Sequence, residues 1–227
     1  MTTAATPPAT PPVPERFRGA WKRVSLALDG AAPTEHADVV WLQTERAYAD
    51  LRIPRYGYGD IVAPMSFAGT TTWADPYLRW SHDLDLDAGS GAGAGSDAGS
   101  GPGAGGSALD ADVGRVRWHG DDLVETGELT EGGRTVSYTE VWRRVAGSAS
   151  GLESHWSADG TCVAVRTGDH ALTIADDRAA GGAFRACYRT RHDGRWSVEL
   201  ALGAGATDLP PPPPTEEMDP AMGVPTR

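Results

Sequence analysis

Hydrophobic and polar residues alternate along most of the chain between residues 17 and 202, and this alternation predicts β-strands. Residues two apart on a strand point to the same face, so a half-buried strand is apolar at every second position. Turn signals such as Asp193-Gly194 separate the segments, and no helical period of useful length interrupts them. We expect roughly nine or ten strands in an antiparallel all-β fold, either a sandwich or a closed barrel. The expected strands lie within 17–28, 38–53, 65–73, 77–86, 112–118, 122–129, 135–145, 161–168, 170–177, 184–190 and 195–202.

Three segments carry too few apolar residues to pack into a core. Residues 1–15 are rich in Pro, Thr and Ala, and residues 207–227 contain a run of five prolines, so both are predicted to be disordered tails. Residues 87–109 form a Gly/Ala/Ser tract, which we interpret as a flexible insertion between two strands, because loop closure costs little extra as a loop lengthens. Residues 16–206 are then expected to form a single β-barrel domain. Two small domains flanking the tract are the alternative, but about 70 residues before it would make a weak core alone.

Polar and aromatic side chains occupy alternate positions on several of the expected strands. Tyr48, Asp50 and Arg52 share one face of their strand, and Ala49 and Leu51 take the opposite face. Such a face suits the inside of a wet barrel, where a small molecule could bind. The alternative places these charges on the outside of an amphipathic sheet. The other sets that share a face are Trp21 with Arg23, Trp80 with His82, and Tyr138 with Glu140, Trp142 and Arg144.

Several short strings resemble those of a known family. FRGAWKR at 17–23, VWLQT at 40–44 and YADLRIP at 48–54 are followed by WSH at 80–82, DVG at 112–114 and YTEVW at 138–142. Together they resemble bacterial relatives of the Hri1-like proteins, over most of the folded chain up to about residue 145. The Hri1-like proteins are in turn similar to calycins, so the resemblance implies a lipocalin-like, antiparallel β-barrel. It implies a fold and carries no particular reaction with it.

Composition excludes several classes of partner. The formal net charge of −11 argues against nucleic acid, whose binding requires Lys and Arg to neutralise phosphates. Arg outnumbers Lys, of which Lys22 is the single example, and Ala, Gly and Asp are abundant, as is typical of proteins from GC-rich bacteria such as actinobacteria. No secretory h-region and no apolar membrane span occur, so we expect a cytoplasmic protein with no membrane partner.

Neither a disulfide framework nor a metal site is expected. Cys162 and Cys187 are too few for either, and the histidines show no HxH or HExxH spacing. The chain has no dinucleotide fingerprint and no P-loop, so we expect no cofactor.

The predicted site is a polar and aromatic barrel lumen that binds a small organic molecule. Buried Asp50 and Glu140 would need arginine partners, because an isolated buried charge is costly. Arginines in such a lumen favour a ligand with a carboxylate or another oxyanion. The expected ligand-binding residues are Trp21, Arg23, Tyr48, Arg52, Trp80 and Trp142.

A cofactor-independent enzyme on the same barrel is the alternative, such as a cyclase, isomerase or lyase of secondary metabolism. Its candidate acids and bases are His82, Glu140, Asp50 and Tyr138, with His82 favoured by the near-neutral pKa of an ordinary imidazole. A third class is an interaction protein that presents its proline run as a polyproline ligand.

Overall fold

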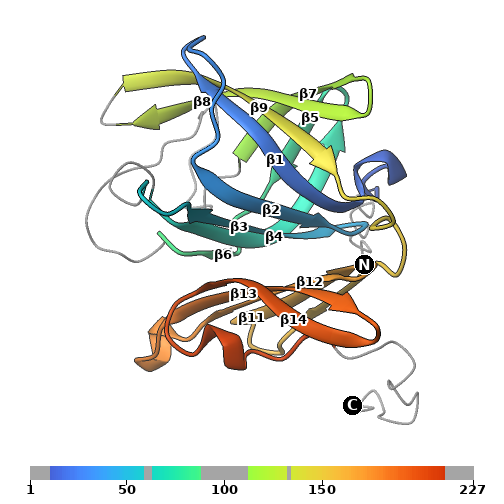
Figure 1. Ribbon diagram of the computed structural model, residues 1–227, viewed down its shortest axis with the longest axis vertical. Helices are drawn as coiled ribbons and strands as arrows, with labels where there is room; N and C mark the ends of the chain where they lie inside the picture. The colour runs from blue at the N-terminus through green and yellow to red at the C-terminus, as the bar shows by residue number, and fades with distance from the viewer. Residues whose placement is uncertain (1–10, 59–62, 88–111, 132–133, 213–227) are drawn as a thin grey trace, which may run out of the picture.

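The computed structural model describes residues 11–58, 63–87, 112–131 and 134–212, and the predicted all-β antiparallel fold is confirmed in them (Figure 1). The strands form a nine-stranded sheet and a five-stranded sheet, more strands than the roughly nine or ten predicted from the sequence. The helical elements of the described residues are short 3-10 turns. None of these helices has the length and apolar character needed to cross a membrane.

Eight strands of the larger sheet close into a barrel. Each strand pairs with the next along the chain, β3 pairs with β4, and β9 returns to pair with β1, so the described strands of the ring leave no free edge. The short strand β6 (Leu84–Asp85) pairs with β4 outside this ring. The barrel strands are β1 (Gly19–Leu28), β2 (Ala37–Gln43), β3 (Ala47–Pro54), β4 (Met65–Ala74), β5 (Tyr77–Trp80), β7 (Asp112–His119), β8 (Asp122–Glu131) and β9 (Arg134–Arg144).

The last five strands form the second sheet, which packs across the outside of the barrel (Figure 1). They are hydrogen-bonded in chain order and apart from the barrel, although the sequence predicted one barrel over 16–206. Whether 16–206 behaves as one domain stays a prediction. The strands are β10 (Glu153–Trp156), β11 (Cys162–Thr167), β12 (His170–Asp176), β13 (Phe184–His192) and β14 (Arg195–Leu202).

An apolar layer joins the two sheets. The face of β3 that carries Ala49 and Leu51 points out of the barrel and packs with Leu172 and Ile174 of β12, and all four side chains are buried. The opposite face of β3 points into the lumen, so this strand is buried on both sides. Covering the outer face in this way explains why the polar face of β3 is the inner one.

One end of the barrel is closed by the 3-10 turn η1 (Glu15–Phe17). Phe17 is fully buried and packs against Trp73 and Trp118, with ring centroids 4.8 and 5.9 Å away. Its carbonyl accepts a 2.8 Å hydrogen bond from Nε1 of Trp21, which is also fully buried. The lumen therefore has an aromatic floor at this end, and its polar residues lie towards the other end.

Parts of the predicted tails pack onto the fold. Val13 is fully buried and donates its N–H to the carbonyl of Glu45, although residues 1–15 were predicted to be a tail. After the turn η3 (Ala206–Asp208), Leu209 is buried and the carbonyl of Pro210 accepts a hydrogen bond from Thr173, so these residues, predicted to lie in a tail from 207, pack onto the fold. Residues 1–10 and 213–227 of the predicted tails, and the Gly/Ala/Ser tract after Asp87, lie outside the described residues.

The shared apolar layer predicts that the barrel and the second sheet stabilise each other. We expect Leu51→Ala to lower the free energy of unfolding by about 2–5 kcal/mol, because it leaves a cavity between the sheets. Val198→Ala is the control on exposed β14 and should change it by less than about 0.5 kcal/mol. Urea unfolding followed by tryptophan fluorescence measures both, and similar small losses in the two variants would contradict this packing.

Candidate functional site

A small cavity lies in the polar part of the barrel lumen. Its volume is about 20 Å³, which is room for about one water molecule. Asp112 lies at the rim, since 34% of its side chain is exposed, whereas Asp50 is buried with 4% exposed. The nine lining residues are five aromatic side chains, three carboxyl groups and one arginine: Trp41, Tyr48, Phe67, Trp80, Trp142, Asp50, Asp112, Glu125 and Arg52.

Arg23 and Arg52 hold together a buried ionic network beside the cavity. Arg23 donates to Glu140 at 2.5 Å and to Glu35 at 2.8 and 3.1 Å. Arg52 donates to Asp50 at 2.8 Å and also to Glu140 at 3.4 Å. Burial raises the pKa of Asp50, and the adjacent Arg52 opposes that rise. Both arginines are therefore committed to carboxylates within the protein.

Glu125 is a buried carboxyl group whose two oxygens both accept hydrogen bonds. Its Oε1 accepts a 2.9 Å hydrogen bond from the Tyr138 hydroxyl, and its Oε2 accepts one of 3.1 Å from Nε1 of Trp142. Burial, together with the negative charge of Glu140 directly opposite on β9, raises the pKa of Glu125 to about 8. At neutral pH this carboxyl group is mostly protonated, while burial and the neighbouring Glu125 raise the pKa of Tyr138.

Two glycines make room for these side chains. A Cβ on Gly114 would lie 2.6 Å from Oε1 of Glu125, and one on Gly127 would lie 2.5 Å from the hydroxyl oxygen of Tyr138. Neither contact is one that a real Cβ makes, so a side chain at either position would force Glu125 or Tyr138 to shift.

His82 supports the wall of the cavity from behind. Its ring stacks on Phe67 with centroids 4.5 Å apart, and its Nδ1 lies 2.9 Å from Oδ2 of Asp85. Nε2 lies 3.3 Å from Oδ2 of Asp112, close enough for an ion pair but outside hydrogen-bond geometry. Burial by itself would lower the pKa of His82, but the carboxylates of Asp112 and Asp85 outweigh it and raise that pKa to about 9. His82 is therefore a cation at neutral pH.

Most of the residues predicted from the sequence lie around this cavity. Tyr48, Asp50, Arg52, Trp80 and Trp142 line it. Tyr138, Glu140 and His82 contact lining residues without lining the cavity themselves, and Arg23 lies one contact further out, against Glu140. Trp21, predicted to bind ligand, lies deeper, where it stacks on Trp41 with centroids 5.7 Å apart, and it is not a lining residue.

Glu125, Asp112 and Glu35 were not among the residues predicted from the sequence. Glu125 lies opposite Glu140 in the β8–β9 hairpin, in which Glu131 pairs with Arg134, whereas counting back from the three-residue turn predicted at 131–133 would have paired Glu125 with Thr139. The turn residues 132 and 133 themselves lie outside the described residues. Asp112 is the first residue of β7 and shares a face with Val116 and Trp118, but the sequence does not show that this face points into the barrel. Glu35 lies in the connection between β1 and β2, where the alternation of a strand does not apply.

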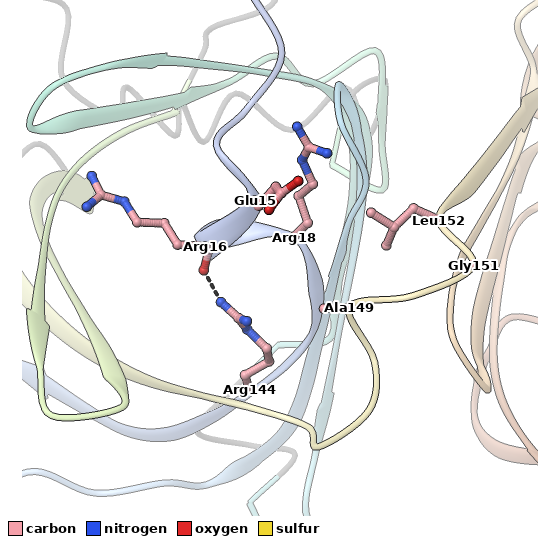
Figure 2. Close-up of a pocket in the computed structure, with 7 residues that line it drawn as sticks. All are labelled: Glu15, Arg16, Arg18, Arg144, Ala149, Gly151 and Leu152. Atoms are coloured by element: carbon pink, nitrogen blue, oxygen red, sulfur yellow. Dashed lines mark hydrogen bonds between the residues drawn. The ribbon is translucent and has the colours of Figure 1, made fainter.

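The structure also has a larger hollow, of about 630 Å³, at the closed end of the barrel (Figure 2). Arg144 donates to the carbonyl of Arg16 there, and its guanidinium lies over the Trp21 ring at 4.8 Å. Arg18 is already bonded to Glu45, and Arg16 extends away from the linker that carries Leu152 (Figure 2). Arg144 was predicted to share the lumen face of β9, but it belongs to this hollow instead.

Metal ligation finds no support among the described residues, where no three His, Cys, Asp or Glu side chains are grouped to hold an ion. Cys162 and Cys187 are free thiols, and burial raises the pKa of both.

Comparison with known proteins identifies a family. The chain matches the family model described as Protein HRI1 over residues 20–221. This match extends well beyond residue 145, where the resemblance seen in the sequence fades, and it includes the second sheet. No curated protein and no solved structure matches the chain.

The ionic network and Glu125 predict opposite responses to loss of charge. Glu140→Gln should lower the free energy of unfolding by about 3–5 kcal/mol, because Arg23 and Arg52 lose a shared buried partner. Glu125→Gln should instead raise the free energy of unfolding at pH 7, by up to about 3 kcal/mol, because glutamine is uncharged without taking up a proton, whereas the wild type has to protonate Glu125 when it folds. Urea unfolding of both variants at pH 7 measures the difference, and equal losses would contradict these assignments.

The pH dependence of stability tests whether Glu125 is protonated in the folded protein. Between pH 4.5 and about 8, folded Glu125 holds a proton that the unfolded chain has lost, so stability falls as pH rises. His82 acts in the same direction only above its ordinary pKa of 6.5, so the wild-type chain is compared with Glu125→Gln at each pH. We expect the wild type to lose up to about 1.4 kcal/mol per pH unit more than the variant. Parallel pH profiles in denaturant unfolding would show that Glu125 is not protonated in the fold.

The close approach at Gly114 predicts a coupling between two positions. Gly114→Ala should cost about 1–3 kcal/mol of stability, because the added methyl group overlaps Glu125. In a Glu125→Ala background the same substitution should cost much less. A double-mutant cycle measured by urea unfolding tests this, and equal costs in both backgrounds would count against the described lumen.

Proposed function

We propose that this chain, which belongs to the HRI1 protein family, is a small-molecule-binding barrel whose ligand enters the polar part of the lumen. One observation carries the proposal: aromatic rings and ionisable groups from β2, β3, β4, β5, β7, β8 and β9 converge on one cavity. Ligand sites typically combine apolar walls with a few well-placed polar groups.

The cost of the ionic network supports a binding role. Removing paired charges from water is costly, and an apolar core of similar volume is often at least as stable. The apolar layer between the sheets shows that the chain builds such packing elsewhere. Keeping Arg52, Asp50 and Glu125 in the lumen has a functional explanation if they orient a ligand.

The size of the cavity limits what enters. About 20 Å³ accommodates a single small polar group, so the remainder of the ligand lies towards the rim at Asp112. The up-and-down order of the eight barrel strands also supports a calycin relationship, because lipocalins share this architecture. We include that relationship in the proposal.

Native mass spectrometry of the full chain, purified from its own host, tests the proposal. We expect one defined small molecule per chain, released on denaturation. Asp112→Asn should reduce its occupancy, and Asp121→Asn, the same substitution on an exposed turn, should not. A chain that carries no molecule, and takes up none from a small-molecule extract of its host, would contradict a binding role.

An enzyme on the same barrel is the second candidate, and Glu125 favours it. A buried carboxyl group with a pKa of about 8, hydrogen-bonded to Tyr138, is suited to general acid–base chemistry near neutral pH. Deleting the gene should then make an intermediate accumulate that the purified protein converts. Glu125→Gln should abolish conversion, while Glu128→Gln on β8, away from the cavity, should not, and an unchanged metabolite profile would exclude this candidate.

A further inference from the structure

We infer that the group held in the lumen is a small organic cation, namely the primary ammonium end of an amine, rather than an oxyanion. The inference rests on the proposed function and specifies its ligand. It follows from the aromatic walls, the balance of charge and the size of the cavity.

The walls of the cavity are suited to a cation. Aromatic ring faces attract positive charge, and cages of such rings are a common way to recognise ammonium groups. Trp41 meets Trp80 and Trp142 nearly edge-on, with interplanar angles of 81° and 72°, so the three indoles form walls in different planes. Phe67 already takes the guanidinium of Arg52 over its ring at 5.0 Å, and protonated His82 stacks on it.

The charges that surround the cavity disfavour binding of an anionic ligand group more strongly than binding of a cationic one. Among the described lining residues Arg52 is the single positive one, and Asp50 and Glu140 already occupy it. Asp50, Asp112 and Glu125 face the same space. An oxyanion would have to displace an internal carboxylate from Arg52, whereas an ammonium group at the rim would share Asp112 with protonated His82, whose Nε2 lies 3.3 Å from Oδ2 of Asp112.

The size of the cavity selects among cations. About 20 Å³ accommodates one group the size of water, and an ammonium group is close to that size. A quaternary ammonium group, with its methyl groups, does not fit this volume. Three N–H donors also match a lining in which carboxyl oxygens predominate over donors.

Glu125 links cation binding to pH. The groups that face it are Tyr138 and Glu140 of β9, Arg52 of β3 and Asp112 of β7. A cation beside Glu125 favours its ionised form, so binding should release a proton while the free group is protonated. Affinity should therefore rise between pH 6 and 8, by up to about tenfold per pH unit.

Isothermal titration of the full chain with methylammonium chloride, sodium acetate and acetamide tests the charge of the ligand. We expect one methylammonium per chain, tighter at pH 8 than at pH 6, and much weaker binding of acetate and acetamide. Asp112→Asn should weaken methylammonium binding at least about tenfold, because it removes a rim charge, and Asp121→Asn should leave it unchanged. Glu125→Gln should remove most of the dependence on pH and the proton release.

The other outcomes separate this inference from the proposed function. Acetate binding that is lost in Arg52→Met would overturn the inference of a cationic ligand. It would leave a lumen that binds an oxyanion, as expected from the sequence. Acetate binding lost in Arg144→Met would place the anion in the closed-end hollow and, without methylammonium binding, would also overturn the inference. If no probe binds while native mass spectrometry finds a bound molecule, the inference of a cationic ligand is wrong and the proposed binding role stands. If neither finds a ligand, both fail.

Discussion

The lumen of this barrel depends on Glu140, which both Arg23 and Arg52 contact. The two guanidinium groups lie on β1 and β3, and Glu140 lies on β9, so the network ties together strands that meet around the ring. A buried charge is tolerated only when it is paired. Because the arginines are satisfied by Glu140, Asp50 and Glu35, the remaining carboxyl groups face the cavity without an arginine of their own among the described lining residues.

This excess of carboxyl groups explains the chemistry of the site. Glu125 lies opposite Glu140 in the β8–β9 hairpin, and like charges at such a pair are unfavourable, so Glu125 keeps its proton to a higher pH than an ordinary glutamate. Gly114 and Gly127 leave the space that Glu125 and Tyr138 occupy. The lumen is thereby rich in carboxyl groups, walled by aromatic rings and sensitive to pH.

The second sheet makes the polar lumen possible. It covers the outer face of β2 and β3 with an apolar layer, so β3 can be apolar outside and polar inside, the reverse of an ordinary surface strand. The turn η1 and its aromatic contacts close one end of the barrel, so the cavity is confined to the opposite, polar end.

The sequence by itself determined the all-β fold and the sets of residues that share a face, because the two-residue period of a strand is a local property. Tyr48, Asp50 and Arg52 are grouped in this way by their spacing alone. Local periodicity carries no information about which face is covered, and only the tertiary structure showed that β12 lies against Leu51 and turns the polar face inwards. Glu35 could not be placed from strand parity, since it lies in a connection, and parity groups Asp112 with Val116 and Trp118 without showing which face points inwards. Their positions depend on contacts between residues far apart in the chain, and such contacts are decided by how the barrel closes.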